Sequence, residues 1–150
     1  MEYHNPVLLH ASVDGLNIKP DGIYVDVTFG GGGHSKEILK RLGPNGKLFA
    51  FDQDEDALAN ALPDERFVLI NENFRHIKRF LRFYGVKSVD GILADLGVSS
   101  HQFDVAERGF STRFDAGLDM RIRKKNDLNA YRVVNEYDEA NLRRVFYDYG

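Results

Sequence analysis

The most informative stretch of this chain is Asp26-Val27-Thr28-Phe29-Gly30-Gly31-Gly32-Gly33-His34-Ser35. It follows a short apolar segment of strand length and leads into a segment with helical spacing. Four consecutive glycines let the backbone turn sharply and approach a ligand closely, which any Cβ would prevent. The helix that begins near Ser35 points free N–H groups into this turn. A glycine run by itself also fits a flexible turn, so its meaning depends on the surrounding residues.

Strand-sized segments and helical segments alternate around this loop. The strand segments, rich in Val, Ile, Leu or Phe, are Ile23–Phe29, Lys47–Asp52, Phe67–Asn71 and Gly91–Leu96. The helical segments are a lead-in helix over Pro6–Leu16, then Ser35–Leu42, Asp54–Leu62 and Phe74–Tyr84. This alternation predicts an α/β fold with a parallel sheet and right-handed crossovers.

Length and composition fit one globular domain. The 150 residues are 43% hydrophobic, and their net charge of −3 does not by itself indicate a nucleic-acid binder. The absence of cysteine excludes disulfides and thiolate metal sites, and the histidines outside the glycine loop lack metal-ligand spacing. We see no signal peptide and no run of membrane-spanning length, and therefore expect a cytoplasmic protein with neither a metal nor a membrane as partner.

An acidic residue, Asp52, ends the second strand segment. In a βαβ unit a carboxylate at this place accepts hydrogen bonds from ribose hydroxyls. Asp52 could instead cap the following helix, although Asp54 can fill that role. The glycine loop and Asp52 together predict an adenosine-type cofactor. They leave S-adenosylmethionine and NAD both open, whereas a P-loop is excluded because no Gly-Lys-Ser/Thr follows the glycines.

The ends of the third and fourth strand segments face the same crevice. Phe74 could pack against an adenine ring or belong to the core of its helix, and the sequence favours neither. Asp95-Leu96-Gly97-Val98-Ser99-Ser100 leaves the fourth segment at its carboxyl end, where open α/β sheets bind ligands. A carboxylate there can accept a hydrogen bond from an amine.

The pattern changes after Leu96. Residues 97–129 are rich in charges without a clean period, and a helix returns over Asp138–Tyr149 with Asp138 as its expected N-cap. A doubly wound sheet usually has more than four strands. We therefore expect this chain to be a fragment of a longer protein.

With these residues in view, the sequence resembles a known family, the cytosine-N4 methyltransferases of small-subunit ribosomal RNA called RsmH or MraW. The resemblance runs from His4-x-Pro6-Val7-Leu8-Leu9 to Tyr149-Gly150 and covers essentially the whole chain. Its most specific blocks are Asp26-x-Thr28-x-Gly30-x-Gly32-Gly33-His34-Ser35, Asp95–Ser100, Arg108-Gly109-Phe110-Ser111 and Leu118-Asp119-Met120-Arg121.

The resemblance implies a class I methyltransferase with a Rossmann-like parallel sheet. Residues 1–102 would supply its first four strands, and residues 103–150 the beginning of a helical substrate-recognition insert. The implied cofactor is S-adenosyl-L-methionine, and the implied acceptor is a cytidine of 16S rRNA in the small ribosomal subunit. The oligomeric state is left undecided, and a homodimer is one possibility. Carried over by motif, the cofactor-binding residues are Gly30, Gly32, Gly33, His34, Asp52, Phe74, Asp95 and Gln102.

Two departures from the family pattern concern the packing of the insert. Ile122 stands where the family usually repeats methionine, and Thr112-Arg113 replaces a more aromatic pair. Family members also continue well past Gly150, so we expect this chain alone to be inactive.

The implied reaction is an in-line attack of the exocyclic amine of cytosine on a methyl group. It needs positioning and a hydrogen-bond acceptor rather than a strong base, and Asp95 is the expected catalytic acceptor. His34 would position the cofactor. The base must be unstacked to reach the pocket. The residues expected to contact RNA are Arg108, Arg121, Arg123, Lys124 and Lys125, although a solvated loop is the commoner fate of such a basic run.

Two other functions remain open at this point. An NAD-dependent oxidoreductase fits the glycine run and Asp52, but the sequence shows no nicotinamide site or hydride partner. A non-catalytic, RNA-binding fragment of the methyltransferase would keep the fold without the activity.

Overall fold

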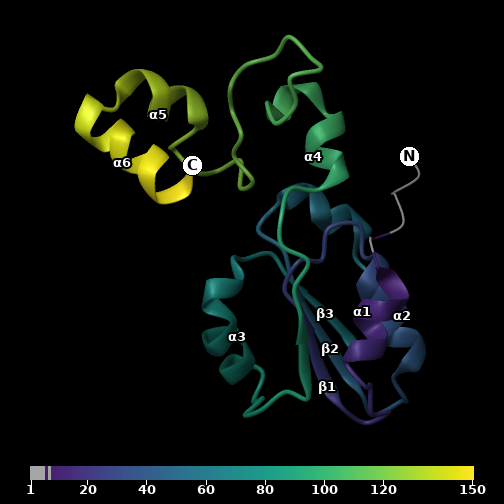
Figure 1. The fold of residues 1–150 in the computed structure, drawn as a ribbon. Coiled ribbons are helices and arrows are strands. Elements are labelled where there is room, and N and C mark those ends of the chain that lie inside the picture. Colours follow the sequence, from purple (N-terminus) through teal and green to yellow (C-terminus); the bar gives the residue numbers. More distant parts are fainter. Residues whose placement is uncertain (1–5, 7) are drawn as a thin grey trace. The chain divides into compact units, whose positions relative to one another are not determined.

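The structure is a computed structural model and describes residue 6 and residues 8–150. The chain divides into two compact units, Met1–Gly97 and Val98–Gly150 (Figure 1). The division falls before the expected domain end at residue 102, so that Gln102 belongs to the second unit. His4 and Val7 of the N-terminal motif lie outside the described residues.

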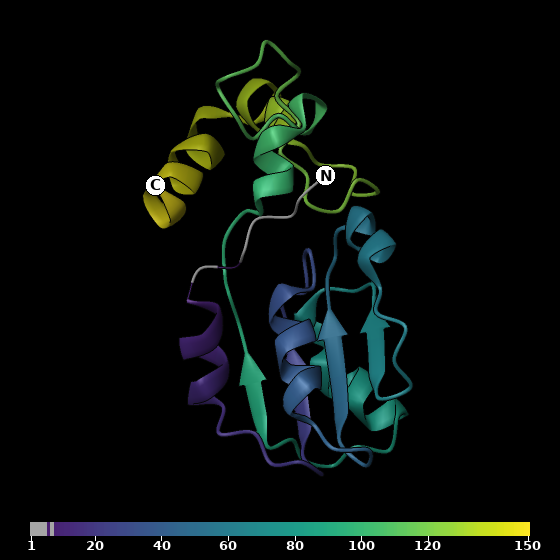
Figure 2. The ribbon, with the colours of Figure 1, turned by 90° about the vertical axis from the view of Figure 1, so that its right-hand side faces the viewer.

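Four parallel strands form the sheet of the first unit. They are β1 Ile23–Asp26, β2 Lys47–Phe51, β3 Phe67–Ile70 and β4 Gly91–Leu93. Their order is β3-β2-β1-β4, with Val25 of β1 paired to Phe49 on one side and to Ile92 on the other. The chain moves outward from β1 to β3 and then returns to the other side of β1 (Figure 2). The α/β fold with a parallel sheet is therefore confirmed.

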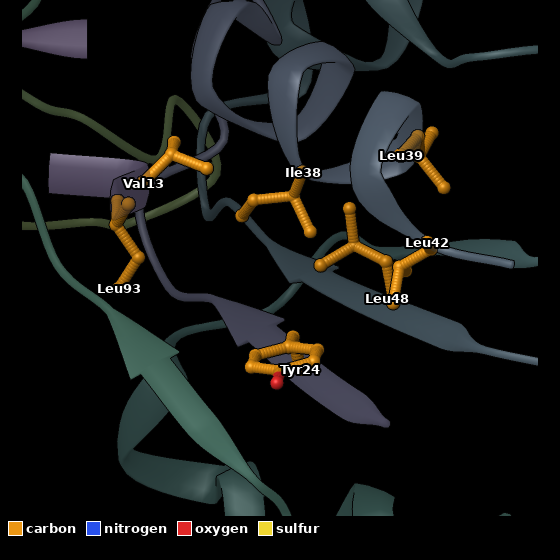
Figure 3. Close-up of a cluster of buried hydrophobic side chains, with 7 residues drawn as sticks. All are labelled: Val13, Tyr24, Ile38, Leu39, Leu42, Leu48 and Leu93. Carbon is orange, nitrogen blue, oxygen red and sulfur yellow. The ribbon is translucent and has the colours of Figure 1, made fainter. Parts of the chain in front are cut away.

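One face of the sheet packs against helices α1 Leu9–Gly15 and α2 Gly33–Arg41. Successive strand residues point to opposite faces, so Tyr24 and Leu48 turn toward these helices. They join helix residues in a buried cluster of Val13, Tyr24, Ile38, Leu39, Leu42, Leu48 and Leu93 (Figure 3). Full burial of each aliphatic side chain contributes roughly 1.5–3 kcal/mol. This cluster fixes α2, and with it the glycine loop, against β1.

The other face carries α3 Ile77–Phe83, which lies across the strands from α1 and α2 (Figure 1). Ile77, Phe80 and Leu81 of α3 pack against the buried strand residues Phe49 and Phe51. These three residues of α3 thus face the sheet, whereas Phe83 and the charged residues of the helix are exposed.

Several boundaries differ from the sequence predictions. β1 and β4 end at Asp26 and Leu93, because the following residues turn into loops; Val27 still donates one 2.9 Å bond to the Leu93 carbonyl. The helix predicted over 54–62 is instead a 3-10 helix, η1 Glu55–Asn60. Asp54 is its N-cap, since its side chain accepts the Asp56 N–H at 3.1 Å.

The remaining helices of the first unit are close to their predictions. The helix predicted over 74–84 opens with a 3-10 turn, η2 Phe74–His76, before α3 begins. The predicted lead-in helix over 6–16 is represented by α1, Leu9–Gly15.

The second unit contains α4 Ser100–Asp104, η3 Ala106–Arg108, α5 Ala130–Glu136 and α6 Glu139–Tyr149. The predicted C-terminal helix is confirmed, and Asp138 caps it by accepting the Asn141 N–H at 2.8 Å. The other three helices were not predicted, because each is short. Their capping residues are a signal that could have revealed α4 and α5, which begin after Ser99 and Asn129.

Candidate cofactor site

The candidate site of the first unit lies at the carboxyl ends of the strands. The order β3-β2-β1-β4 makes a topological switch point between β1 and β4, and open α/β sheets bind ligands there. The glycine loop follows β1, Asp52 follows β2 and Asp95 comes shortly after β4. Because the strands are all parallel, these residues gather at one edge of the sheet.

The glycine loop is anchored by two side chains that bind the backbone of Gly30. Gly30 donates its N–H to Asp52 Oδ2 at 2.8 Å, and its carbonyl accepts Asn60 Nδ2 at 3.0 Å. Gly32 is the N-cap of α2 at φ 78°, and a Cβ there would lie 2.9 Å from the Phe29 ring. Only glycine fits this conformation and this space. The first N–H groups of α2, like those of any helix, have no partner within the helix, and Gly32 offers them no side-chain cap.

Asp52 supports the loop from the second strand. Its Oδ2 accepts the Gly30 N–H and its Oδ1 accepts the Asp54 N–H at 2.9 Å. Asn71, at the end of β3, donates to the carbonyls of Asp52 and Asp54 at 2.9 and 3.2 Å. These contacts fix the Asp52 carboxylate at the carboxyl edge of the sheet, where a βαβ unit places an acceptor for ribose hydroxyls.

Asp26, the last residue of β1, is completely buried. It lies on the face of the sheet that α2 covers, and its Oδ2 accepts the Ser35 hydroxyl at 2.7 Å. Its Oδ1 accepts the Thr28 N–H at 3.1 Å. Burial raises the pKa of the Asp26 carboxyl, and the hydrogen bond from Ser35 opposes this rise. Asp26 thus ties the end of β1 to the first turn of α2.

Thr28 extends this network toward the fourth strand. Its Oγ1 lies 3.5 Å from Asp26 Oδ1 and accepts the backbone N–H of Asp95 at 2.8 Å. The Asp95 side chain is exposed at the carboxyl edge. Asp26, Thr28 and Ser35 belong to the glycine-loop motif, but no role was predicted for their side chains. Side chains alternate between the two faces of a strand, which places Asp26 on the face that α2 covers. This alternation is the signal that could have predicted its contact with Ser35.

His34, the second residue of α2, is only 5% exposed. Its Nε2 has no hydrogen-bond partner among the described residues. Leaving a buried polar nitrogen unpaired costs about 1–3 kcal/mol. Such an atom beside a glycine cradle is a place where a polar group of a ligand would be bound. The site therefore fits a small polar cofactor.

Phe74 and Gln102 complete the set of predicted cofactor residues. Phe74 begins η2 and its side chain is 41% exposed, so it is not a plain core residue. Gln102 is buried in the second unit, where it forms a capping box with Ser99. Ser99 donates its N–H to Gln102 Oε1 at 3.1 Å, and Gln102 donates its N–H to Ser99 Oγ at 3.2 Å. These contacts give Gln102 a structural role at the start of α4.

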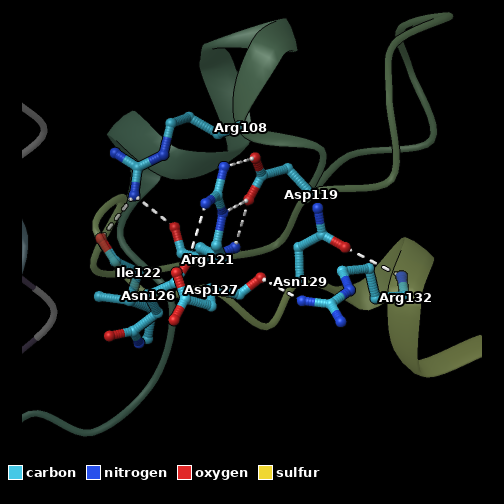
Figure 4. A network of polar contacts seen from close by, with 8 residues as sticks. All are labelled: Arg108, Asp119, Arg121, Ile122, Asn126, Asp127, Asn129 and Arg132. Atoms are coloured by element: carbon cyan, nitrogen blue, oxygen red, sulfur yellow. Dashed lines mark hydrogen bonds and ion pairs between the residues drawn. The ribbon is translucent and has the colours of Figure 1, made fainter. Parts of the chain in front are cut away.

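The predicted RNA residues Arg108 and Arg121 make internal contacts in the second unit (Figure 4). Arg108 is 4% exposed and donates Nη2 to the carbonyls of Arg121 and Ile122, each at 3.0 Å. Arg121 binds both carboxylate oxygens of Asp119 at 2.8 Å. This ion pair lowers the pKa of the Asp119 carboxyl. The two arginines hold the loop together, which favours a structural role for them.

The other predicted RNA residues lie in the same loop. Lys124 and Lys125 are exposed and Arg123 is half-buried. A contact of these side chains with RNA stays a prediction. Within residues 6 and 8–150, no group of three or more His, Cys, Asp or Glu side chains is arranged to hold a metal. None of the helices in the described part of the chain is long and apolar enough to cross a membrane.

Together, the strand order, the glycine cradle and the carboxylate after β2 define a Rossmann-like domain of the kind that binds adenosine-type ligands. The chain belongs to the MraW methylase family, whose model matches residues 1–150.

Relatives from several bacteria are similar over almost the whole chain. Ribosomal RNA small subunit methyltransferase H of Flavobacterium johnsoniae is 88% identical over 150 residues, which are 100% of this chain and 50% of that protein. The protein of the same name in Christiangramia forsetii is 73% identical, covering 99% of this chain and 49% of the relative. Among solved structures, TrmN from Thermus thermophilus is 29% identical with a TM-score of 0.49, over 59% of this chain and 27% of that one. The chain spans about half the length of the curated relatives it matches.

Proposed function

We propose that this chain forms the cofactor-binding part of an S-adenosylmethionine-dependent methyltransferase that acts on the N4 amine of a cytidine in 16S rRNA. The observation that carries the proposal is the buried, unpartnered Nε2 of His34 beside the glycine cradle. The family match and the names of the relatives support the same activity. The substrate would be the small ribosomal subunit, in the cytoplasm.

The residues that would hold the cofactor follow from the contacts of the site. Gly30, Gly32, Gly33 and His34 would form the cradle for its methionine part, where first-turn N–H groups favour a carboxylate. Asp52, fixed just after β2, would accept the ribose hydroxyls. Phe74 would cover the adenine, and a contact of Gln102 with the cofactor stays a prediction from the family motif.

The chemistry is divided between the cofactor and the chain. The cofactor, when bound, supplies an activated methyl group. Asp95 would orient the amine of the target base by accepting one of its hydrogen bonds, which favours a pyramidal nitrogen. Thr28 fixes the backbone of Asp95 at 2.8 Å, and Asp26 in turn supports Thr28. Arg108, Arg121, Arg123, Lys124 and Lys125 stay candidates for RNA contact in the second unit.

Calorimetric titration with S-adenosylmethionine and with NAD tests the cofactor. We expect binding of S-adenosylmethionine alone; binding of NAD without S-adenosylmethionine would support the oxidoreductase and end this proposal. Family membership already favours the methylase.

Transfer of a labelled methyl group to small-subunit particles tests the activity. Methyl transfer by this chain is compared with transfer by a longer form of the protein, as long as the curated relatives. Transfer by the longer form alone would make the present chain an incomplete part of the enzyme. Cofactor binding without transfer by either form would support a non-catalytic, RNA-binding role.

A further inference from the structure

The segment 74–89 has a charge pattern unlike the rest of the chain. It contains five Lys or Arg residues and no Asp or Glu, although the whole chain carries 23 acidic and 20 basic residues. The basic residues Arg75, Lys78, Arg79, Arg82 and Lys87 are all exposed. Positive charge is therefore concentrated on one segment of an acidic protein.

Most of these cations share one face. Positions 75, 78, 79 and 82 follow the spacing i, i+3, i+4 and i+7, which places side chains in a stripe along a helix. The opposite side of α3 is buried against the sheet through Ile77, Phe80 and Leu81. We call the outward stripe the α3 surface and define it as Arg75, Lys78, Arg79, Arg82 and Phe83. It starts at η2, beside the candidate cofactor site, and runs along α3.

No cation of the α3 surface forms an ion pair with a carboxylate within the described ranges. Arg75 donates Nε to the His76 ring at 3.0 Å, and the Arg79 guanidinium lies 6.0 Å from the centre of the Phe80 ring. Other helices differ in this respect. Arg41 pairs with Glu37 in α2, Arg132 with Glu136 in α5, and Arg144 with Asp148 in α6. The charge of the α3 surface is thus left without internal compensation.

An exposed aromatic side chain lies at the end of the same stripe. Phe83 is 81% exposed, and its ring meets Tyr84 edge-on at a centroid distance of 5.2 Å. Cations next to an exposed aromatic ring suit single-stranded RNA, because phosphates neutralise the charges and an unstacked base can stack on the ring.

We propose that the α3 surface binds ribosomal RNA through its phosphates, with one base stacked on Phe83. The proposal rests on the proposed function, which makes rRNA the substrate. It adds a second RNA-contacting region, separate in sequence from the basic run at 121–125. RNA whose target base enters the site would continue along α3.

The test compares two double variants of the intact protein that contains this chain. Arg79→Ala with Arg82→Ala removes two charges from the α3 surface; Lys36→Ala with Lys40→Ala removes two exposed charges from α2, on the other face of the sheet. The dissociation constant for small-subunit rRNA is measured at several salt concentrations. We expect the α3 variant to bind about tenfold more weakly and to reduce the salt slope by about 1–2. The α2 variant should change affinity by less than about twofold.

A second pair of variants tests the aromatic contact. Phe83→Ala should weaken RNA binding by about fivefold or more with an unchanged salt slope, and Phe83→Tyr should keep the affinity. Circular dichroism and calorimetric binding of S-adenosylmethionine serve as controls, and both should stay at wild-type values in all four variants.

Equal effects of the α3 and α2 variants, or no effect of either, would overturn the RNA surface while leaving the methyltransferase intact. If the α3 variant loses binding to phosphatidylserine vesicles but keeps its RNA affinity, the proposed RNA surface is also overturned. That result would indicate a membrane-binding surface. A wild-type protein that binds neither S-adenosylmethionine nor rRNA would instead reject the proposed function.

Discussion

The backbone N–H of Asp95 donates a 2.8 Å hydrogen bond to Thr28 Oγ1, and this bond joins the loop after β4 to the loop after β1. The two residues lie 67 positions apart in the sequence. Thr28 is itself held by the buried carboxylate of Asp26 through its N–H at 3.1 Å. Asp95, the expected catalytic residue, is thus positioned by Thr28.

Thr28→Val should separate positioning from cofactor binding. Valine keeps the shape of threonine but cannot accept the Asp95 N–H, a loss of about 1 kcal/mol. We expect methyl transfer by the intact protein to fall by about fivefold in kcat, with the dissociation constant for S-adenosylmethionine changed by less than about threefold. Thr28→Ser is the matched control and should restore kcat. A parallel loss of stability and cofactor affinity would show a general structural role instead.

His34→Leu should affect the ligand site more than the fold. Leucine fills the buried position and removes the unpaired Nε2, so the free energy of unfolding should change by less than about 1 kcal/mol. Calorimetry should show binding of S-adenosylmethionine weakened by at least about tenfold, as expected when a charged or polar ligand group loses its partner. A large fall in the unfolding free energy, measured in urea, together with unchanged affinity would contradict this assignment.

The sequence was sufficient to predict the elements that follow from local patterns. The glycine run, Asp52 and the four strand segments are each ambiguous alone, but their order along the chain fits one βαβ pattern and made the prediction specific. The Thr28–Asp95 bond could not be predicted, because it depends on β4 lying next to β1 in the parallel register. The same holds for Asn60, whose contact with the Gly30 carbonyl needs the position of η1.

The second unit was harder to predict because its loop conformation depends on backbone contacts between residues that lie apart in the sequence. Gly109 adopts φ 71°, and a Cβ there would lie 2.5 Å from the Gly117 carbonyl. Met120 donates its N–H to the Arg108 carbonyl at 2.9 Å. These contacts join two family-specific blocks, 108–111 and 118–121. Backbone contacts of this kind produce no periodic hydrophobic pattern in the sequence, so they could not be predicted from it. They also account for the burial of Arg108, one of the predicted RNA contacts.

Asp52→Ala should weaken the binding of S-adenosylmethionine by about 1–3 kcal/mol through loss of charged hydrogen bonds. Asp52 also holds Gly30, so the variant alone cannot distinguish direct contact from loop support. Asn60→Ala is the control, because Asn60 holds the same glycine through its carbonyl at 3.0 Å. If calorimetry gives equal losses for the two variants, Asp52 acts by supporting the loop. Unchanged affinity in Asp52→Ala would remove Asp52 from the site.

Asp64 and Arg66 give a pH-dependent contribution to stability at the start of β3. Arg66 binds both carboxylate oxygens of Asp64, at 2.9 and 2.6 Å, and also donates to the Leu42 carbonyl at the end of α2. The Arg66 hydrogen bonds lower the pKa of Asp64 from 3.8 to about 2. A carboxyl whose pKa is lower in the folded state stabilises the fold above its unfolded pKa. This contribution is lost as the pH falls from about 4 to about 2.

Asp64→Asn should therefore lower the free energy of unfolding at pH 6 by about 1 kcal/mol, a value reduced for solvent screening of this partly exposed pair. The difference between variant and wild type should shrink as urea denaturation is repeated at pH 4, 3 and 2. Asp21→Asn is a suitable control, since Asp21 is exposed and lies in the same unit. A difference that stays constant across this range would mean that Asp64 contributes through neutral hydrogen bonding and not through its charge.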